Sequence, residues 1–335
     1  MAVNHAFRLI SRPVGLPARE NFEFVDVPVG EPGPDEVHVR VLYISLDPAM
    51  RGWMNDTRSY IPPVGIGEVM RALGLGRVEE SRHPDFAVGD HVIGLLGVQE
   101  RAVVHGAGLT PVDPGVAPLP VHLNALGMTG LTAYFGLLDI GRPEAAQTVV
   151  VSGAAGAVGA LVGQIAKLKG ARAVGIAGGP TKCRYIVEEL GFYAAVDYKH
   201  EDVAAALRDR CPNGIDVYFD NVGGEILDAA LAHLARGARV VICGAISQYN
   251  ASDGMRGPAN YMSLLVNHAS MTGFVVFDYA KRYEEGRRAM AGWLANGGIT
   301  SREDIVDGLE SFPETLVKLF TGDHLGKLMI RVAED

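Results

Sequence analysis

Cysteine and long apolar runs are both scarce in this chain. Only Cys183, Cys211 and Cys243 occur among 335 residues, too few and too widely spaced for a disulfide framework. Their scarcity favours a reducing compartment, and we expect Cys243 to pack in a core. No run approaches the roughly 18 apolar residues of a membrane span, and the N-terminus lacks the apolar stretch of a secretory signal. We therefore predict a cytoplasmic protein with no membrane partner.

Positive charge is also in short supply. The chain has 30 Lys and Arg against 39 Asp and Glu, a formal net charge of −9, and its basic residues are dispersed. A nucleic-acid-binding surface needs a concentrated basic patch, so neither nucleic acid nor an anionic membrane is an expected partner. The length does suffice for two domains, each with a core of its own.

Sequence patterns that bind metals are missing as well. No Cys precedes Cys183, and the 10 histidines are scattered without a His-Glu-x-x-His or similar pair. An isolated histidine such as His91 is therefore interpreted as a structural residue. We predict that the protein has no metal site.

The most informative segment that is present runs from Val149 to Gly163. A β-branched run meets glycines at 153, 156 and 159, and a helical apolar pattern follows at once. Free N–H groups and the positive end of a helix dipole converge at such a turn, which favours binding of a pyrophosphate. Gly156 would let the backbone approach the phosphates, and Gly159 would let helix and strand pack closely. An ordinary strand-to-helix turn is the alternative, since Ala154 stands where the usual fingerprint has its first glycine.

The end of the next strand indicates which dinucleotide is bound. Residues 172–177 read as a strand, and NAD-binding folds usually place an Asp or Glu at its end to hold the ribose hydroxyls. Here the continuation is Gly178-Gly-Pro-Thr-Lys182, without a carboxylate to repel a 2′-phosphate. Lys182 supplies a cation instead, so the pattern favours NADP. The alternative is that Lys182 is a solvated residue in the first turn of a helix capped by Thr181.

Helices and strands continue to alternate along the middle of the chain. We expect helices at 183–190 and 202–210 and through Leu227, Leu231 and Leu234, with strands at 195–198, 215–220, 239–243 and 271–276. This order predicts a parallel sheet that binds ligands at the carboxyl ends of its strands. The first 125 residues instead carry short alternating runs between Pro and Gly clusters, and this pattern predicts an all-β region in the form of a small barrel. The tail has helical residues 316–320 and a strand at 328–332, and its pattern alone does not assign it to either part.

Motifs from end to end of the chain resemble those of one enzyme family. They are Ser45-Leu-Asp-Pro-Ala-Met-Arg-Gly-Trp-Met54, Gly127-Met-Thr-Gly-Leu-Thr-Ala-Tyr134, Ala154-Ala-Gly-Ala-Val-Gly159, Tyr218-Phe-Asp-Asn-Val-Gly-Gly224, Cys243-Gly-Ala-Ile-Ser-Gln-Tyr-Asn250 and Gly322-Asp-His-Leu-Gly-Lys327. The chain resembles the zinc-free medium-chain dehydrogenase/reductases, in particular the leukotriene B4 dehydrogenase/prostaglandin reductases and curcumin-reductase-like NADP-dependent oxidoreductases.

The resemblance implies an α/β protein of two domains. A GroES-like β-barrel domain, for substrate and catalysis, would comprise residues 1–125 and a C-terminal return at 301–335. A Rossmann domain, with a doubly wound parallel sheet that binds NADP, would comprise residues 126–300. The resemblance also implies a homodimer whose nucleotide-binding sheets pair edge to edge.

The resemblance further implies roles for individual residues at the cofactor. Lys182 and Tyr198 would contact the 2′-phosphate, and Asn221 would lie by the nicotinamide ribose; a turn residue and an exposed aromatic are the alternatives for Asn221 and Tyr198. His324 replaces the family's cofactor-binding Asn, and a neutral imidazole still offers one donor or one acceptor. The pyrophosphate would lie on Gly156, Ala157, Val158 and Gly159, and the nicotinamide end on Cys243, Gly244, Ala245, Ile246, Ser247, Tyr249, Phe274, Val275 and Val276.

The chemistry expected of such a site requires no metal. Zinc-dependent relatives carry a Cys where this chain has Ser45-Leu-Asp-Pro48, and a Gly-His-Glu where it has Ile66-Gly-Glu68. We therefore expect hydride transfer from NADPH to the β-carbon of an α,β-unsaturated ketone or aldehyde, with a proton donor near the carbonyl oxygen. Tyr249 is the favoured donor, Tyr60 and Tyr261 are the others, and the cofactor's ribose hydroxyl can serve too. Quinone reduction and non-catalytic NADPH binding are the alternative functions.

Overall fold

Two compact units make up the chain. The computed structural model describes residues 3–335, and the units are Met1–Leu123 with Glu303–Asp335, and Asn124–Arg302. We call them the β unit and the sheet unit. The bounds expected from the sequence, 125/126 and 300/301, each lie two residues from those of the structure.

The β unit is built on antiparallel strands. Its main sheet has the order β14-β15-β3-β4-β5-β7, with β6 paired to β3, and β1 and β2 form a separate ribbon. Its strands are β1 (Val3–Leu9), β2 (Phe22–Pro28), β3 (Glu36–Ser45), β4 (Gly74–Ser81), β5 (His91–Gly94), β6 (Arg101–His105), β7 (Thr110–Val112), β14 (Glu303–Asp307) and β15 (Lys327–Arg331).

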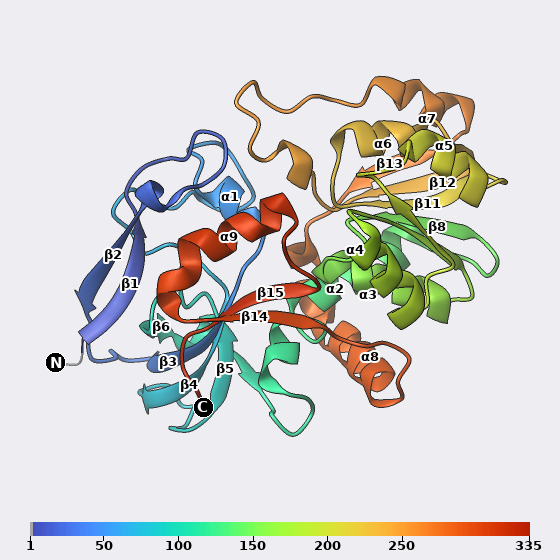
Figure 1. Ribbon diagram of the computed structural model, residues 1–335. Coiled ribbons are helices and arrows are strands. Elements are labelled where there is room, and N and C mark those ends of the chain that lie inside the picture. Colours follow the sequence, from blue (N-terminus) through green and yellow to red (C-terminus); the bar gives the residue numbers. More distant parts are fainter. Residues whose placement is uncertain (1–2) are drawn as a thin grey trace. The chain divides into compact units, whose positions relative to one another are not determined.

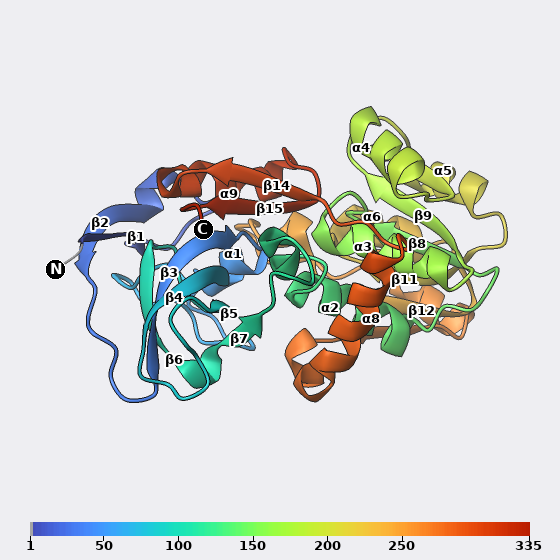
Figure 2. The same cartoon turned by 90° about the horizontal axis from the view of Figure 1, so that it is seen from below.

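The C-terminal tail belongs to the β unit. Strand β15 pairs with β3 in antiparallel and with β14 in parallel orientation, and Figures 1 and 2 show the red β14 and β15 running side by side. Helix α9 (Phe312–Thr321) buries Phe312 and Leu316 in the same core as Phe7 and Val39 of the N-terminal strands. Burial of these side chains therefore assigns a segment that its pattern alone did not.

One short helix corrects the all-β expectation for the first 125 residues. Helix α1 (Ala49–Trp53) is a single turn whose Met50 and Trp53 are buried. The buried Arg51 guanidinium donates to the carbonyl oxygens of Pro13 and Gly15, at 3.1 Å each. A five-residue helix is too short to display a 3.6-residue period, and tertiary contacts rather than pattern stabilise it.

The sheet unit contains one parallel sheet of six strands. Its order is β10-β9-β8-β11-β12-β13, so successive strands step outward in one direction from β8 and in the other from β11. The bounds are β8 (Thr148–Ser152), β9 (Arg172–Ala177), β10 (Ala194–Asp197), β11 (Ile215–Asp220), β12 (Leu234–Ile242) and β13 (Ser270–Gly273). In sheets of this type ligands bind beyond the carboxyl ends of the strands, at the point where the order reverses. Here that point lies between β8 and β11.

Helices cover both faces of this sheet, as a doubly wound fold requires. Figure 1 shows α5 and α6 on one face and α2, α3 and α8 on the other. The helices are α2 (Met128–Phe135), α3 (Ala157–Leu168), α4 (Pro180–Arg184), α5 (Val203–Arg210), α6 (Gly224–Leu231), α7 (Met262–Val266) and α8 (Tyr283–Ala295). The expected helix at 183–190 is α4 followed by one π-helical turn, Tyr185–Glu189.

Several element boundaries differ from the sequence prediction, and three of them have a clear structural reason. Helix α6 ends at Leu231, and Leu234 opens β12 opposite Ile215, so its helical spacing from Leu227 is coincidental. Strand β12 ends at Ile242, the partner of Asp220, and the N–H groups of both Cys243 and Gly244 donate to the Asp220 carbonyl oxygen. Strand β13 ends at Gly273, which leaves 274–276 in the following loop and turn.

Candidate cofactor site

The turn between β8 and α3 has the geometry of an anion cradle. Gly153 has φ +60°, a conformation suited to glycine, and Gly156 is the N-cap of α3 in an extended conformation. No side chain caps this helix and no acidic residue lies in its first turn. A Cβ at Gly159 would lie 2.4 Å from the Gly153 carbonyl oxygen, so only glycine permits this approach of helix to strand. The N–H of Gly156 donates to the Gly153 carbonyl oxygen at 3.0 Å, and the partly exposed Ala157 and Val158 that follow present N–H groups to an incoming anion.

A second group of predicted residues gathers at the ends of β9 and β10. Tyr198 directly follows β10, and its ring lies over Gly178, where an added Cβ would come within 2.8 Å of it. Lys182 lies in α4, whose N-cap is Gly179 and whose first residue is Pro180, so Thr181 is not the cap. Pairing of β9 with β10 thus brings the loop that leads into α4, the helix that contains Lys182, beside Tyr198.

Sequence reasoning missed a carboxylate at this place. Asp197 ends β10 opposite Ala177, and its Oδ1 accepts the N–H of Gly179 at 2.7 Å. Burial alone would raise the pKa of Asp197, but the N–H groups of Gly179 and Lys199 and the His200 ring lower it below its usual value. The aspartate therefore stays ionised while it bonds the loop. Its position directly before Tyr198, already singled out, was the available signal.

A buried hydrogen-bond cluster lies at the ends of β8 and β11. The Asp220 side chain is only 1% exposed, and its Oδ1 accepts the hydroxyl groups of Ser152 at 2.8 Å and Tyr218 at 3.0 Å. The N–H groups of Val222 and Gly223 also donate to Oδ1, at 3.1 and 3.0 Å. Burial raises the pKa of Asp220 despite these donors. Sequence analysis did not select Asp220, whose partner Ser152 is 68 positions away.

The same cluster positions Asn221. Its N–H donates to the hydroxyl oxygen of Ser152 at 2.8 Å, and its side-chain amide donates to the Ser152 carbonyl oxygen at 2.7 Å. The N–H groups of Cys243 and Gly244 donate to the carbonyl oxygen of Asp220, at 2.9 and 3.0 Å. The structure therefore brings three predicted residues, Asn221, Cys243 and Gly244, to one junction of β8, β11 and β12.

The loop after β12 is bonded to the loop after β11. Ser247 Oγ donates to the carbonyl oxygen of Val222 at 2.7 Å, and the N–H of Ile246 donates to the carbonyl oxygen of Asn221 at 3.2 Å. The Tyr249 hydroxyl oxygen accepts the N–H of Ala245 at 3.1 Å, which folds the ring back onto its own loop. Burial raises the pKa of the Cys243 thiol to about 12, so this half-buried thiol stays protonated at neutral pH.

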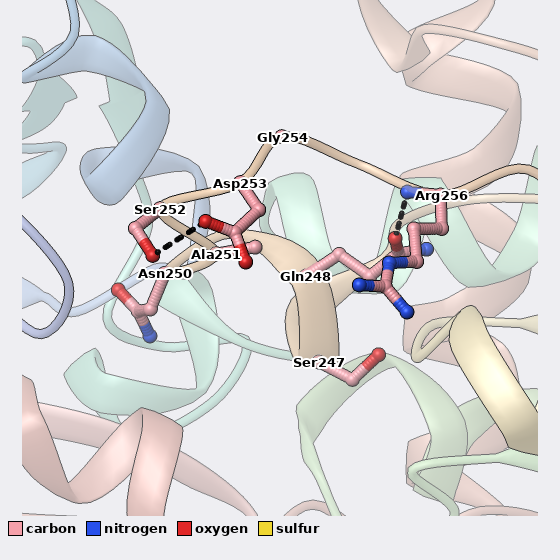
Figure 3. A pocket seen from close by; sticks show the side chains of 8 residues that line it. All are labelled: Ser247, Gln248, Asn250, Ala251, Ser252, Asp253, Gly254 and Arg256. Carbon is pink, nitrogen blue, oxygen red and sulfur yellow. Dashed lines mark hydrogen bonds between the residues drawn. The ribbon is translucent and has the colours of Figure 1, made fainter.

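An open polar pocket continues from this loop. Figure 3 shows its lining side chains on one irregular segment, where the N–H of Arg256 donates to Gln248 Oε1 at 2.6 Å. It is lined by Ser247, Gln248, Asn250, Ala251, Ser252, Asp253, Gly254 and Arg256. Only Ser247 among these was a predicted site residue.

The remaining predicted residues are more dispersed. The Phe274 ring packs on Phe219 and Tyr279, with centroids 6.5 and 6.4 Å apart, and Val275 and Val276 follow it. Tyr261 is 57% exposed beside α7. Tyr60 and His324 belong to the β unit, where His324 Nδ1 lies 3.1 Å from the Lys318 carbonyl oxygen. A carbonyl only accepts, so Nδ1 carries the proton and Nε2 of the neutral ring is an acceptor.

An ion pair occupies the segment where zinc-dependent relatives would have a cysteine. Asp47 Oδ1 accepts the Lys327 ammonium at 2.6 Å, Asp47 Oδ2 accepts the Ser45 hydroxyl at 2.5 Å, and Lys327 is 2% exposed. Across residues 3–335 no cluster of three His, Cys, Asp or Glu side chains has an arrangement that holds a metal. In the same part of the chain, no helix is long and apolar enough to cross a bilayer.

Comparison with known proteins places these features in a family. The profile of the N-terminal domain of oxidoreductases matches residues 5–112, and that of zinc-binding dehydrogenases matches residues 157–292. The chain is 44% identical to the NADPH-dependent curcumin reductase of Escherichia coli, over 99% of this chain and 98% of that protein. The chain belongs to the medium-chain dehydrogenase/reductase family. It is an oxidoreductase, and the family predicted from its motifs is confirmed.

Two further relatives support the assignment at the level of sequence and of structure. Prostaglandin reductase 1 of Mus musculus is 38% identical, with 95% of each chain covered. The crystal structure of CurA from Vibrio vulnificus in complex with NADPH superposes with a TM-score of 0.94 at 43% identity, covering 99% of this chain and 100% of that one. This match confirms the predicted combination of a Rossmann domain with an N-terminal β domain.

Proposed function

We propose that this medium-chain dehydrogenase/reductase uses NADPH to reduce the carbon–carbon double bond of α,β-unsaturated ketones and aldehydes. The observation that carries the proposal is the uncapped N-terminus of α3, at a turn where glycine alone fits at position 159. Its relatives include the curcumin reductase, a 2-alkenal reductase of Nicotiana tabacum and the prostaglandin reductase, all named as reductases. From these names we infer a small-molecule substrate with a conjugated double bond.

The residues of the sheet unit fit NADPH along its length. Gly156 to Gly159 would hold the pyrophosphate, because uncapped N–H groups and the helix dipole attract it. Lys182 and Tyr198 would hold the 2′-phosphate, and Asn221 the nicotinamide ribose. Loop residues 243–249 and 274–276 would line the nicotinamide end, and His324 of the β unit is a further proposed contact. When bound, NADPH supplies a hydride.

The chain itself must then supply a proton or stabilise charge on the substrate oxygen. Tyr249 is our choice for this task. Its hydroxyl oxygen accepts the N–H of Ala245, which holds the ring on the loop proposed for the nicotinamide. A neutral tyrosine hydroxyl persists at pH 7 because its ordinary pKa is about 10. Tyr60 and Tyr261 are exposed and remain the second choices.

Isotope transfer tests the proposed reaction directly. NADPH with deuterium at the transferred position should place the label on the carbon β to the carbonyl in the saturated product. The α-hydrogen should come from solvent, because protonation is a separate event from hydride transfer. Label on the carbonyl carbon, with an allylic alcohol as product, would refute the proposal. Turnover of quinones alone would support the quinone reductase alternative, and NADPH binding without oxidation would support the non-catalytic one.

We also propose that the reaction needs no metal. The Lys327 ammonium already pairs with Asp47 and bonds the Leu46 carbonyl oxygen where a zinc ligand would be expected. A chelator should leave the rate of enone reduction unchanged, and elemental analysis should find no stoichiometric zinc. Inhibition by the chelator that added zinc reverses would contradict this expectation.

A homodimer in the cytoplasm is the assembly we propose. Strand β13 is an edge of the six-stranded sheet, and all four of its residues are exposed. Leu265 and Val266 at the end of α7 are exposed apolar side chains nearby in the chain. An open strand edge with apolar neighbours favours pairing with a second copy. Sedimentation of the purified protein as a monomer at micromolar concentration would exclude the dimer.

A further inference from the structure

The loop between β9 and α4 has its conformation fixed by residues of the next strand. Gly179 has φ +94°, which excludes side chains in practice, and its carbonyl oxygen accepts the N–H of Cys183 at 3.1 Å to start the helix. Its N–H donates to Asp197 Oδ1 at 2.7 Å. One residue therefore sets both the entry to α4 and the contact with β10. Lys182 lies in the turn that this residue starts.

Asp197 is itself held from several sides. Its Oδ1 also accepts the N–H of Lys199 at 3.1 Å, and its Oδ2 lies 2.8 Å from Nδ1 of the exposed His200. Its own N–H donates to Glu201 Oε2 at 2.8 Å, and Glu201 in turn accepts Arg210 of α5 at 2.6 Å. The side chain is 14% exposed. Both carboxylate oxygens are thus committed to the protein, and the residue has one rigid orientation.

The orientation of the Asp197 carboxylate explains how a negative charge can lie close to a proposed phosphate site. An ionised carboxylate near the end of β9 would, if it faced the ligand, accept ribose hydroxyls and repel a 2′-phosphate. Here it faces the backbone of Gly179 instead, and the Tyr198 ring lies against Gly178 on the same loop. The Asp197 carboxylate therefore stabilises the loop between β9 and α4 and does not form part of the proposed binding surface.

We propose that Asp197 is a specificity-determining positioning residue for NADPH. It holds Gly179 and the first turn of α4 so that Lys182 meets the 2′-phosphate without a search among loop conformations. This inference rests on the proposed function, because it assumes that Lys182 contacts that phosphate. Preorganised contacts bind more tightly since less conformational freedom is lost on binding. The benefit should then exist only for the ligand that has the phosphate.

Direct binding of NADPH and NADH tests this role apart from turnover. Asp197→Ala should weaken NADPH about tenfold, the scale of one hydrogen bond to a charged group, while NADH changes less than about twofold. In a Lys182→Ala background the same substitution should have no further effect on NADPH, since the group it positions is gone. Asp197→Asn keeps one acceptor for Gly179 and should lie between wild type and Asp197→Ala.

Asp202→Asn provides a matched control. Asp202 caps α5 by accepting the N–H of Ala205 at 2.7 Å, so it is an equally local carboxylate with no bond to the loop. It should leave the ratio of NADPH to NADH affinity unchanged. Equal losses for both cofactors in Asp197→Ala, an unchanged effect in the Lys182→Ala background, or wild-type affinity in both Asp197 variants would overturn the inference alone. A wild-type protein that does not bind NADPH would overturn the proposed function with it.

Discussion

Two aspartates end separate strands of the same parallel sheet, and their pKa values are shifted in opposite directions. Asp197, at the end of β10, is partly exposed and has a lowered pKa. Asp220, at the end of β11, is buried and has a raised pKa, although hydroxyl and N–H groups donate to it as well. Donors favour the charged form and desolvation disfavours it. At Asp197 the donors together outweigh desolvation, and at the more deeply buried Asp220 desolvation outweighs the donors.

The two aspartates also differ in what they hold. Asp197 fixes one loop, at the end of the sheet proposed for the adenosine 2′-phosphate. The Asp220 side chain joins the end of β8, through the Ser152 hydroxyl, to the turn after β11, through the N–H groups of Val222 and Gly223. The N–H groups of Cys243 and Gly244 after β12 donate to its backbone carbonyl oxygen instead. Loss of the Asp220 side chain should therefore destabilise the junction of β8 and β11, whereas loss of the Asp197 side chain should weaken the binding of one cofactor.

The largest expected effect is on stability at the buried site. Asp220→Ala leaves the hydroxyl groups of Ser152 and Tyr218 and two N–H groups without their acceptor. Each buried unsatisfied group costs about 1–3 kcal/mol, so we expect a loss of about 3 kcal/mol or more in the free energy of unfolding. Urea denaturation measures it. Ser152→Ala removes one donor to the acid and the acceptor of the Asn221 N–H, so it should cost about 1–2 kcal/mol. Equal losses in the two variants would contradict the central role of Asp220.

A smaller effect, confined to one ligand, is expected on the adenosine side. Lys182→Ala should weaken NADPH binding by about 1.5–3 kcal/mol, as for a lost hydrogen bond between charged groups, and leave NADH almost unchanged. Isothermal titration with each cofactor provides the measurement. Equal losses for both cofactors would mean that Lys182 supports the structure and does not contact the phosphate.

The smallest expected effect is on the pH dependence of the free energy of unfolding, which should differ between the two aspartates. The pKa of Asp197 is lowered in the fold, so its contribution to stability is present above its unfolded pKa of about 4 and is lost as pH falls through the folded value. The pKa of Asp220 is raised, so its contribution is present below about 4 and is lost as pH rises through the folded value. Relative to their Asp→Asn variants, unfolding free energies against pH should slope in opposite directions. Parallel slopes would refute the contrast.

The sequence pattern predicted the buried strands of the parallel sheet better than the exposed edge strand of the β unit. Strands β9 and β11 have the bounds expected from their apolar runs and the glycines beside them. Strand β14 reads Glu-Asp-Ile-Val-Asp, and its partly exposed, acidic sequence gave no strand signal. Its place at an edge beside β15 allows such a composition.

Only part of the candidate site could be predicted from the sequence. The glycine turn and Lys182 follow from spacing along a single strand and helix. Asp197 and Asp220 do not, because each acts on a segment brought to it by strand pairing: Gly179 lies 18 positions from Asp197, and Ser152 lies 68 from Asp220. A carboxylate that accepts backbone N–H groups of a distant segment is not marked by any periodic pattern in the sequence.

The place of β15 has a consequence for how the chain folds as it is made. This strand lies between β14 and β3, and Lys327 within it bonds Leu46 and Asp47, 281 and 280 positions earlier. The ribosome makes the N-terminus first, so the end of β3, Tyr43 to Ser45, cannot pair with β15 until residues 329–331 have been made, although β3 can already pair with β4 and β6. The sheet unit, continuous from Asn124 to Arg302, has no such delay. We therefore expect the nascent chain to complete its second unit before its first.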